Sequence, residues 1–354
     1  MTPAVVRLIA AVGLIALFAV PVRAEWTDAR RAEFVTSFIT GHVVPRYAAL
    51  ASGAREMHAA AEAFCASPSK GRLAAARAAF SKAYLAWMGV QHIRFGPAMR
   101  DDAHYRLQFW PDKHGQGAKQ IRRLMLADTP VLTAQELARA SVALQGFPAL
   151  ERLVFGDDAA LLSGDAKAAR RCALIWSVTA NVERLSREVH AGWGPYLPDD
   201  PANTMREIVR VYLEHLQVIT ELKLKRPLGK SIEAARPKRS EAWRSGLSFG
   251  AISANLNALQ AIYAGERGWP GFKEFLARDD ETQSMATAFE EHFWYGAKVI
   301  AGQASSMPDT VQSEQGRRVL LALIGTVDEI REFSFTVLPE GLGVTLGFNS
   351  LDGD

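Results

Sequence analysis

The sequence predicts an all-α protein, and three observations lead to that class. Apolar residues recur at steps of three and four along almost the whole chain after residue 25, which is the period of an amphipathic helix. Residues 165–193 hold the longest such run and predict a helix of about 28 residues, roughly 42 Å long. Thr133 and Glu136 have the spacing of a helix capping box. The apolar positions of the longest run share one face: Leu174, Val178, Val182, Leu185 and Val189.

In the first half of the chain, prolines, glycines and serines separate the predicted helices. Thr27 or Asp28 caps a first helix, which Pro45 is expected to kink or end because proline lacks a backbone N–H. The Ala-rich run 71–93 has large apolar residues on one face and predicts a long helix. The other helices expected before residue 165 span 46–64, 116–127, 133–144 and a short segment that ends at Phe155.

The second half shows the same helical period with one basic interruption. Residues 223–239, KLKRPLGKSIEAARPKR, combine positive charge with prolines and a glycine, which predicts a loop whose charges are solvated; binding of an anionic partner is the alternative. The tail from Leu338 is rich in glycine and is expected to be extended. The predicted helices of this half span 201–224, 240–263, 282–303 and 310–333.

The first 24 residues have the pattern of a secretory signal peptide. Arg7 supplies a basic start, an apolar core of 13 residues runs from Leu8 to Val20, and small residues precede a cleavage point after Ala24. This core is shorter than the about 20 residues that cross a bilayer, and no later segment is expected to span a membrane. Removal of Arg7 and Arg23 leaves 39 basic and 38 acidic side chains, so nothing in the charge favours a nucleic-acid partner.

The chain has two cysteines, Cys65 and Cys172, which lie 107 residues apart. A secreted protein meets an oxidising compartment, so the two are the candidates for a disulfide; a pair of buried free thiols is the alternative. Such a bond would close a long loop and contribute about 4–5 kcal/mol on the chain-entropy model.

Two stretches depart from the helical pattern, 91–112 and 141–156. In the first, residues 106–112, RLQFWPD, combine aromatic residues, Arg106 and Asp112 around a proline, and these seven residues are predicted to form a loop or a short extended segment. Arginine and tryptophan bind anions and stack on planar ligands. The interpretation that we favour is an internal latch, with the arginine paired to the aspartate and the aromatic rings filling the end of a bundle; ligand binding is the alternative.

The second stretch contains GFPALE, residues 146–151, which is similar to the GxHxxE motif of the imelysin-like family of bacterial periplasmic proteins, iron-regulated protein A among them. RPLGKS, ARPKRSEAWRSGLS and the ending LGFNSLDGD also resemble this family, so the resemblance covers nearly all of the mature chain. It implies two helical bundles in pseudo-duplicated halves, although the halves show no clear sequence repeat. The expected division is a signal peptide over 1–24, an N-terminal bundle over 25–199 and a C-terminal bundle over 200–354.

Pro148 stands where the family motif has its histidine. A histidine and a glutamate three residues apart share a helix face and can both bind one metal ion, whereas Pro148 offers no side-chain ligand. Glu151 alone supplies one carboxylate, and a transition-metal site needs about three or four ligands. The structural interpretation is that Gly146 and Pro148 start a helix and Glu151 lies near its positive end; direct ligation by Glu151 is the alternative.

The resemblance implies either metallopeptidase chemistry or iron uptake. A metal peptidase needs an open coordination position and a base, but the sequence has no HExxH and no pair of histidines at i, i+4. It also lacks the GxSxG, GxxxxGK and strand-associated GxGxxG patterns. If a metal binds, iron or zinc is expected. The candidate ligands are Glu151, His92 and His114, with Asp112, Glu290 and His292 as further donors.

We therefore expect a periplasmic binding protein of the cell envelope, linked to uptake of iron or another metal, with no catalytic residue assigned. Its partner would be a small ligand, a metal or another envelope protein. The alternatives are a metal-dependent peptidase with ligands outside GFPALE and a non-catalytic scaffold that binds another protein. The expected cleft lies between the two halves and consists of Arg94, Arg106, Trp110, Asp112, Gly146, Pro148 and Glu151.

Overall fold

The computed structural model describes residues 26–156, 158–276 and 280–345. The fold is all-α, as predicted: within these ranges the one β feature is an isolated bridge between Glu266 and Trp269. The predicted signal peptide and the last nine residues of the tail lie outside the described ranges. None of the described helices is both long enough and apolar enough to cross a membrane.

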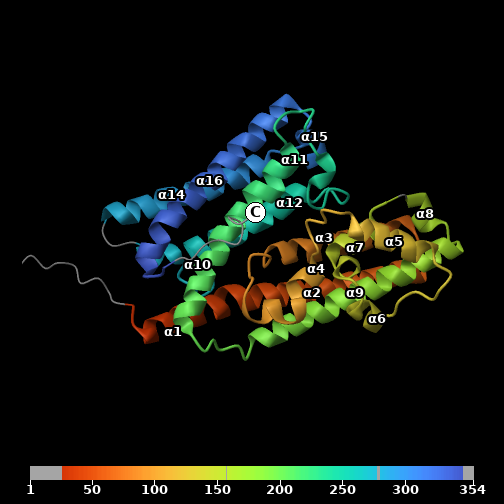
Figure 1. The fold of residues 1–354 in the computed structure, drawn as a ribbon, viewed down its shortest axis with the longest axis horizontal. Coiled ribbons are helices and arrows are strands. Elements are labelled where there is room, and N and C mark those ends of the chain that lie inside the picture. The colour runs from red at the N-terminus through yellow and green to blue at the C-terminus, as the bar shows by residue number, and fades with distance from the viewer. Residues whose placement is uncertain (1–25, 157, 277–279, 346–354) are drawn as a thin grey trace, which may run out of the picture.

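One group of helices comes mainly from the first half of the chain (Figure 1). Helix α2 packs along both α3 and α9. Gly53 permits the close approach of α2 and α3, because a Cβ there would lie 3.2 Å from the Cα of Ala83. The long helices of this group are α1 (Asp28–Phe38), α2 (Val44–Ala66), α3 (Lys70–Met88) and α9 (Ala166–Trp193).

Helices α1 and α2 join without a break through a π-helical turn, η1 (Ile39–Val43). Pro45 therefore does not end the first helix, and Val44 before it keeps helical angles, φ −56° and ψ −48°. A π turn shifts the hydrogen-bond pattern by one residue, which suits a proline because proline cannot donate to the usual α-helical partner.

Short elements fill the chain between α3 and α9, where two predicted helices prove shorter than expected. The helix expected over 71–93 ends at Met88, and the following residues form tight turns such as Ile93 N to Val90 O at 2.9 Å. The capping box of Thr133 and Glu136 is present. The helix it begins ends at Arg139, because Ala140 is extended. These elements are η2 (Gly96–Asp102), α4 (Ala103–Leu107), α5 (Gln116–Leu126), α6 (Ala134–Arg139), η3 (Val142–Leu144), α7 (Phe147–Val154) and α8 (Asp158–Leu162).

A second group of helices comes from the second half, where α16 packs against α10 and α14 and α12 packs against α14 (Figure 1). Its elements are α10 (Pro201–Gln217), the π-helical η4 (Val218–Lys225), α11 (Arg226–Leu228), η5 (Pro237–Arg239), α12 (Ser248–Ala264), α13 (Phe272–Leu276), α14 (Asp280–Ala301), α15 (Met307–Thr310) and α16 (Glu314–Leu342).

Two boundaries in this half differ from the predicted ones. The helix expected from residue 240 begins only at Ser248, because residues 240–247 form a compact turn closed by Leu247 N to Ala242 O at 3.1 Å. The last helix continues to Leu342 with Pro339 inside it, so the start of the tail is helical and not extended. Its buried face, which includes Leu338 and Leu342, stabilises this extra length.

The two groups share one hydrophobic core, with buried residues from both halves in a single cluster. Helix α1 packs on α10, and α12 packs on α3. The contacts between the groups are therefore made by long helices as well as by loops. The division into two bundles at residues 199 and 200 stays a prediction.

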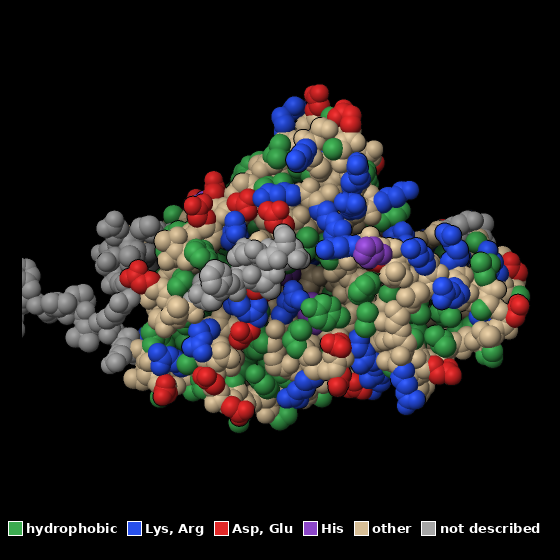
Figure 2. Space-filling view, in the orientation of Figure 1, with side chains coloured by type: hydrophobic (Ala, Val, Ile, Leu, Met, Phe, Trp, Pro, Cys, Tyr) green, Lys and Arg blue, Asp and Glu red, His purple; other side chains and the backbone are tan. Residues whose placement is uncertain are grey.

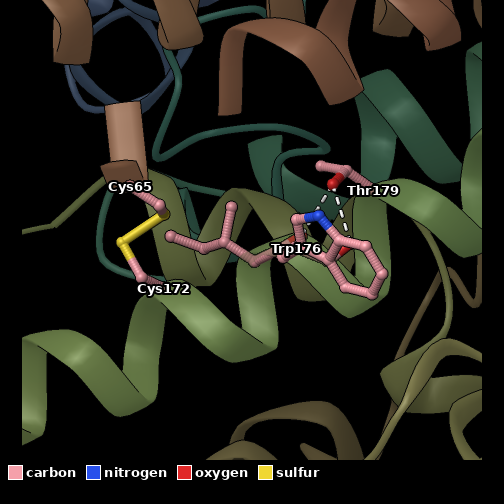
Figure 3. Close-up of a disulfide and its surroundings, with 5 residues drawn as sticks. Cys65, Cys172, Trp176 and Thr179 are labelled. Atoms are coloured by element: carbon pink, nitrogen blue, oxygen red, sulfur yellow. Dashed lines mark hydrogen bonds between the residues drawn. A yellow bond between two sulfur atoms is a disulfide. The ribbon is translucent and has the colours of Figure 1, made fainter. Parts of the chain in front are cut away.

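Cys65 at the end of α2 and Cys172 in α9 form a disulfide, with Cα atoms 5.4 Å apart (Figure 3). Trp176 lies one turn further along α9. The bond lies beside a small apolar cluster, separate from the main core, that contains Phe64, Leu73, Ala76 and Leu161. It thus links two long helices that also pack along each other, at the end where this small cluster lies.

Replacement of both cysteines by serine is expected to lower the free energy of unfolding by about 2–5 kcal/mol, with the chain-entropy value for a long loop at the upper end of this range, because the unfolded chain regains the freedom of that loop. Urea denaturation followed by circular dichroism measures the loss. Wild type in reducing agent should match the double variant, and the double variant should not respond to the reducing agent. Equal stability of the oxidised wild type and the double variant would contradict a stabilising role.

Candidate functional site

A cavity of about 130 Å³ lies where three segments far apart in the sequence meet. They are the loop 108–113 after α4, the start of α7, and the segment 238–244 that leads into α12. Figure 2 shows Lys and Arg side chains gathered over the region where α11 and the start of α12 face α5 and α7. The cavity therefore lies between the two groups of helices and is lined by both.

The loop 108–113 is held in place by Asp112. Its carboxylate accepts hydrogen bonds from the backbone N–H groups of Gln116 and Gly117, at 2.8 and 2.9 Å, and so caps the start of α5. The preceding peptide bond, between Trp110 and Pro111, is cis. Trp110 and Asp112 both line the cavity, but the carboxylate is occupied by the helix it caps.

The GFPALE segment forms the start of α7, with Gly146 as its N-cap and Pro148 in the first turn. A side chain at Gly146 would clash with the carbonyl group of Leu107, so glycine is required by the close approach of the two backbones. Pro148 and Glu151 line the cavity. Glu151 Oε1 accepts hydrogen bonds from both the backbone N–H and the Oγ of Ser245, each at 2.9 Å. Glu151 thus connects α7 to the turn before α12.

A buried polar network lies behind the cavity wall, centred on Lys223. Its Nζ lies 2.7 Å from Glu241 Oε2 and 2.7 Å from Gln91 Oε1, and it donates to Asn255 Oδ1 at 2.5 Å. Glu241 in turn accepts a hydrogen bond from Gln108 Nε2 at 2.5 Å, which ties the network to the cavity loop. Burial lowers the pKa of Lys223, and the charge of Glu241 opposes that shift.

The burial of Lys223 corrects the prediction that the basic run 223–239 is a solvated loop. The run begins inside the helix, because η4 continues α10 as far as Lys225. Lys223 faces inward with 1% of its side chain exposed, whereas Lys238 and Arg239 further along the run are exposed. A basic side chain at that depth requires paired partners, which Glu241 and the neighbouring amides supply.

Beyond this network lies a group of buried histidines. His42 Nδ1 lies 2.8 Å from Glu266 Oε1, and His42 Nε2 lies 3.0 Å from His92 Nε2. The rings of His92 and His215 are 5.9 Å apart. Arg46 also donates to Glu266. Burial lowers the pKa of His42 to about 4 and holds the pKa values of His92 and His215 well below the usual range.

The structure brings only some of the predicted cleft residues together. Trp110, Asp112, Pro148 and Glu151 line the cavity, and Gly146 lies just behind it against Leu107. The other two predicted residues lie elsewhere.

Arg94 and Arg106 do not line the cavity. Arg94 donates to the Tyr105 hydroxyl at 3.0 Å. Arg106 donates to Gln145 Oε1 at 2.8 Å and to the carbonyl of Ala138 at 3.1 Å. The predicted latch therefore exists in a different form, in which Arg106 holds the segment before α7 and makes no pair with Asp112.

The predicted metal ligands are not gathered at one place. His92 belongs to the buried histidine group, His114 is exposed, and Glu151 is bonded to Ser245. Among the further donors, Glu290 pairs with Lys273 and His292 with Glu329 in the second group of helices. Across the described ranges, no group of three or more His, Cys, Asp or Glu side chains is placed to hold a metal ion. The donor set at GFPALE does not fit a resident metal.

Sequence reasoning missed the residues that give the cavity its charge. Basic side chains from α7, α11 and the segment 238–244 line it, and the basic run 223–239 was the one signal that could have indicated them. The missed residues are Lys113, Arg152, Arg226, Lys238, Arg239 and Arg244 around the cavity, and Lys223 and Glu241 in the network behind it.

Comparison with solved structures shows the class of the fold. An imelysin-like protein from Psychrobacter arcticum 273-4 superposes with a TM-score of 0.76 over 92% of this chain and 99% of that chain, at 18% identity. A protein from Parabacteroides distasonis, assigned as an iron-regulated protein A precursor, gives a TM-score of 0.66 over 89% and 96% of the two chains, at 15% identity. At these identities the likeness shows a shared all-helical fold.

Sequence comparison then gives the family. The model of the imelysin family, Peptidase M75, matches residues 43–332, and the chain belongs to this family. The iron-regulated protein A of Synechococcus elongatus is 25% identical over 247 residues, which are 66% of this chain and 64% of that relative. The match thus spans a little under two thirds of the relative's length.

Proposed function

We propose that this chain is a non-catalytic binding protein of the cell envelope, connected with iron or another metal, whose ligand enters the cavity beside α7. One observation carries the proposal. Two segments that resemble imelysin-like proteins, GFPALE and ARPKRSEAWRSGLS, come from opposite halves of the chain, and both contribute residues to this one cavity. Cavities that are built from both halves of a fold are common ligand sites.

Two further observations support the proposal. A relative is named for its regulation by iron, which favours iron over other metals as cargo. The disulfide between Cys65 and Cys172 suits an oxidising compartment such as the periplasm. The periplasmic location itself stays a prediction from residues 1–24.

Elemental analysis tests the proposal, on mature protein purified from periplasm without a chelating tag. We expect iron, or another metal, to accompany the protein in stoichiometric amount as a complex with its own anionic groups, because the described residues offer no set of metal ligands and the cavity is lined by basic side chains. Pro148→Trp places an indole in the cavity and should reduce the bound metal at least tenfold. Leu197→Trp adds the same indole at an exposed position outside the cavity and should leave it unchanged. Circular dichroism confirms that both variants fold.

Two outcomes would overturn the proposal. One is metal retained in full by the Pro148→Trp variant. The other is a parent protein that carries no metal and gains none on titration with iron and zinc, each added free and as a complex with a small carboxylate. The same preparation tests the alternative of a metal-dependent peptidase. Cleavage of a peptide substrate that a chelator abolishes would favour that alternative over a binding protein.

A further inference from the structure

The cavity is strongly basic. Three acidic residues also line it, but each is engaged: Asp112 caps α5, Glu151 binds Ser245, and Glu241 pairs with Lys223. By contrast, no hydrogen bond or ion pair within the described ranges is made by the side chains of Arg152, Arg226 or Arg239. Six basic side chains line the cavity: Lys113, Arg152, Arg226, Lys238, Arg239 and Arg244. Such surroundings repel a free cation and attract an anion.

The arginines fall into two pairs of like charge. Burial lowers the pKa of Arg226, and the neighbouring Arg239 lowers it further. Burial also lowers the pKa of Arg244, and so does Arg152, while Glu151 opposes that shift from 4.0 Å. Two guanidinium groups held close together without an anion between them repel each other, and a carboxylate or phosphate group between them would remove this repulsion.

The two pairs are carried by different parts of the fold. Arg226 and Arg239 belong to α11 and η5, both in the second group of helices. Arg152 comes from α7 and Arg244 from the turn before α12, two segments that the hydrogen bond from Ser245 to Glu151 joins, and both arginines line the cavity. Arg244 is held in place by Trp243, whose ring centre lies 4.1 Å from the guanidinium carbon. One anionic group cannot satisfy both pairs unless they converge on one point, so a ligand with two such groups fits better.

The cavity limits the size of the ligand. Its volume of about 130 Å³ is close to that of a cavity of about 150 Å³ that holds benzene. Apolar rings, among them Phe109, Trp110 and Trp243, form part of the wall. A short carbon chain or a single bridging atom between two charged ends matches this combination of small volume, apolar wall and separated positive charges.

We propose that the cavity binds a small dianion with two oxyanion groups, one on Arg152 and Arg244 and the other on Arg226 and Arg239. The inference rests on the proposed function, since it takes the cavity as the ligand site and names the chemical class of the ligand. The two groups are carboxylates or phosphates, and the dianion is either the free ligand or the shell of a metal complex.

Isothermal titration calorimetry of the mature chain tests the proposal with two matched pairs of probes. Succinate and butyrate share a four-carbon chain but carry two and one carboxylates; pyrophosphate and inorganic phosphate carry two and one phosphoryl groups. We expect at least one two-group probe to bind tenfold or more tightly than its one-group counterpart. The pair that shows the difference distinguishes carboxylate from phosphate ligands. Binding should also weaken as salt is raised.

Arginine variants identify the place of binding. Arg152→Gln and Arg226→Gln should each weaken the two-group probe at least tenfold. Arg206→Gln, on α10, removes a half-buried arginine outside the cavity and should leave binding unchanged. The proposal is overturned if neither two-group probe exceeds its counterpart, or if Arg152→Gln or Arg226→Gln binds as the wild type does. If the Pro148→Trp variant loses its metal but the wild type binds neither two-group probe, this inference alone is overturned. If the wild type binds a two-group probe but carries no metal, the metal connection alone is overturned.

Discussion

Replacement of Lys223 by methionine is expected to lower the free energy of unfolding by about 3–5 kcal/mol, because it leaves a buried carboxylate without its partner. Lys223 and Glu241 are 1% and 3% exposed, and their charged atoms are 2.7 Å apart. Gln91 and Asn255 would also lose a hydrogen-bond donor. Urea denaturation followed by circular dichroism measures the change.

Lys225→Met is the matched control, two residues further along η4. Lys225 is 40% exposed and pairs with Glu221 and Asp328 at the surface, where such pairs contribute about 1 kcal/mol or less. The double variant Lys223→Met with Glu241→Gln removes both charges and should regain part of the loss. A Lys223→Met variant no less stable than Lys225→Met would show that the pair is not needed for stability.

Acidification from pH 7 to pH 5 is expected to destabilise the protein by about 2 kcal/mol for each histidine whose pKa is depressed to about 4, by proton linkage. His42 and His104 have pKa values of about 4, which burial lowers from 6.5. Between those values the unfolded chain binds protons that the native state does not. The contribution of these histidines to the free energy of unfolding is therefore fully present above pH 6.5 and is lost as the pH drops towards 4.

The charged neighbours of His42 do not reverse this loss of stability, because Glu266 raises the pKa of His42 and Arg46 lowers it, but burial has the largest effect. Burial raises the pKa of Glu266, but hydrogen bonds from His42 and Arg46 outweigh that effect and bring it to about 2. This carboxylate therefore stays ionised in the native state throughout the range, and its own contribution to stability is lost only below pH 4.5. His92, on the other side of His42, also has a depressed pKa.

Denaturation curves at several pH values measure the slope of the free energy of unfolding against pH. His104→Gln should reduce it by about 0.7 of a proton on average between pH 7 and pH 5, because burial lowers the pKa of His104 from 6.5 to about 4. His114→Gln, at an exposed position, should leave the slope unchanged. An identical slope in wild type and His104→Gln would mean that His104 takes up its proton equally in both states.

The helix with the longest apolar face could be predicted almost to the residue. The helix expected over 165–193 is α9 (Ala166–Trp193), since its apolar positions alone determine which side packs. Residues 240–247 could not be predicted in this way. They have helical composition, but Ser245 binds Glu151, nearly a hundred residues earlier in the chain, and the segment forms a turn instead. Contacts of such long range have no local signal.

The candidate site likewise contains some residues that have a local signal in the sequence and others that only the fold brings together. Trp110, Pro148 and Glu151 were predicted from short segments with unusual composition, and they line the cavity. The arginines of the basic run were set aside because a charge run in a sequence is usually solvated. Only the packing of α11 and η5 shows that Arg226 and Arg239 face the same space as α7. Charge can be counted from a sequence, but the convergence of charges depends on the fold.

The uninterrupted helix from Asp28 to Ala66 has a mechanical consequence. Its first part, α1, packs on α10 in the second group of helices, and its second part, α2, packs on α3 and α9 in the first. The extra residue of the π turn at 39–43 rotates the buried stripe by about 100° relative to a regular helix, so one rod presents a contact face to each group. Any swing of one group against the other has to bend this rod. A change in the width of the cavity that moved whole bundles would therefore bend this rod, so rotation of side chains at the rim is the less costly way to admit a ligand.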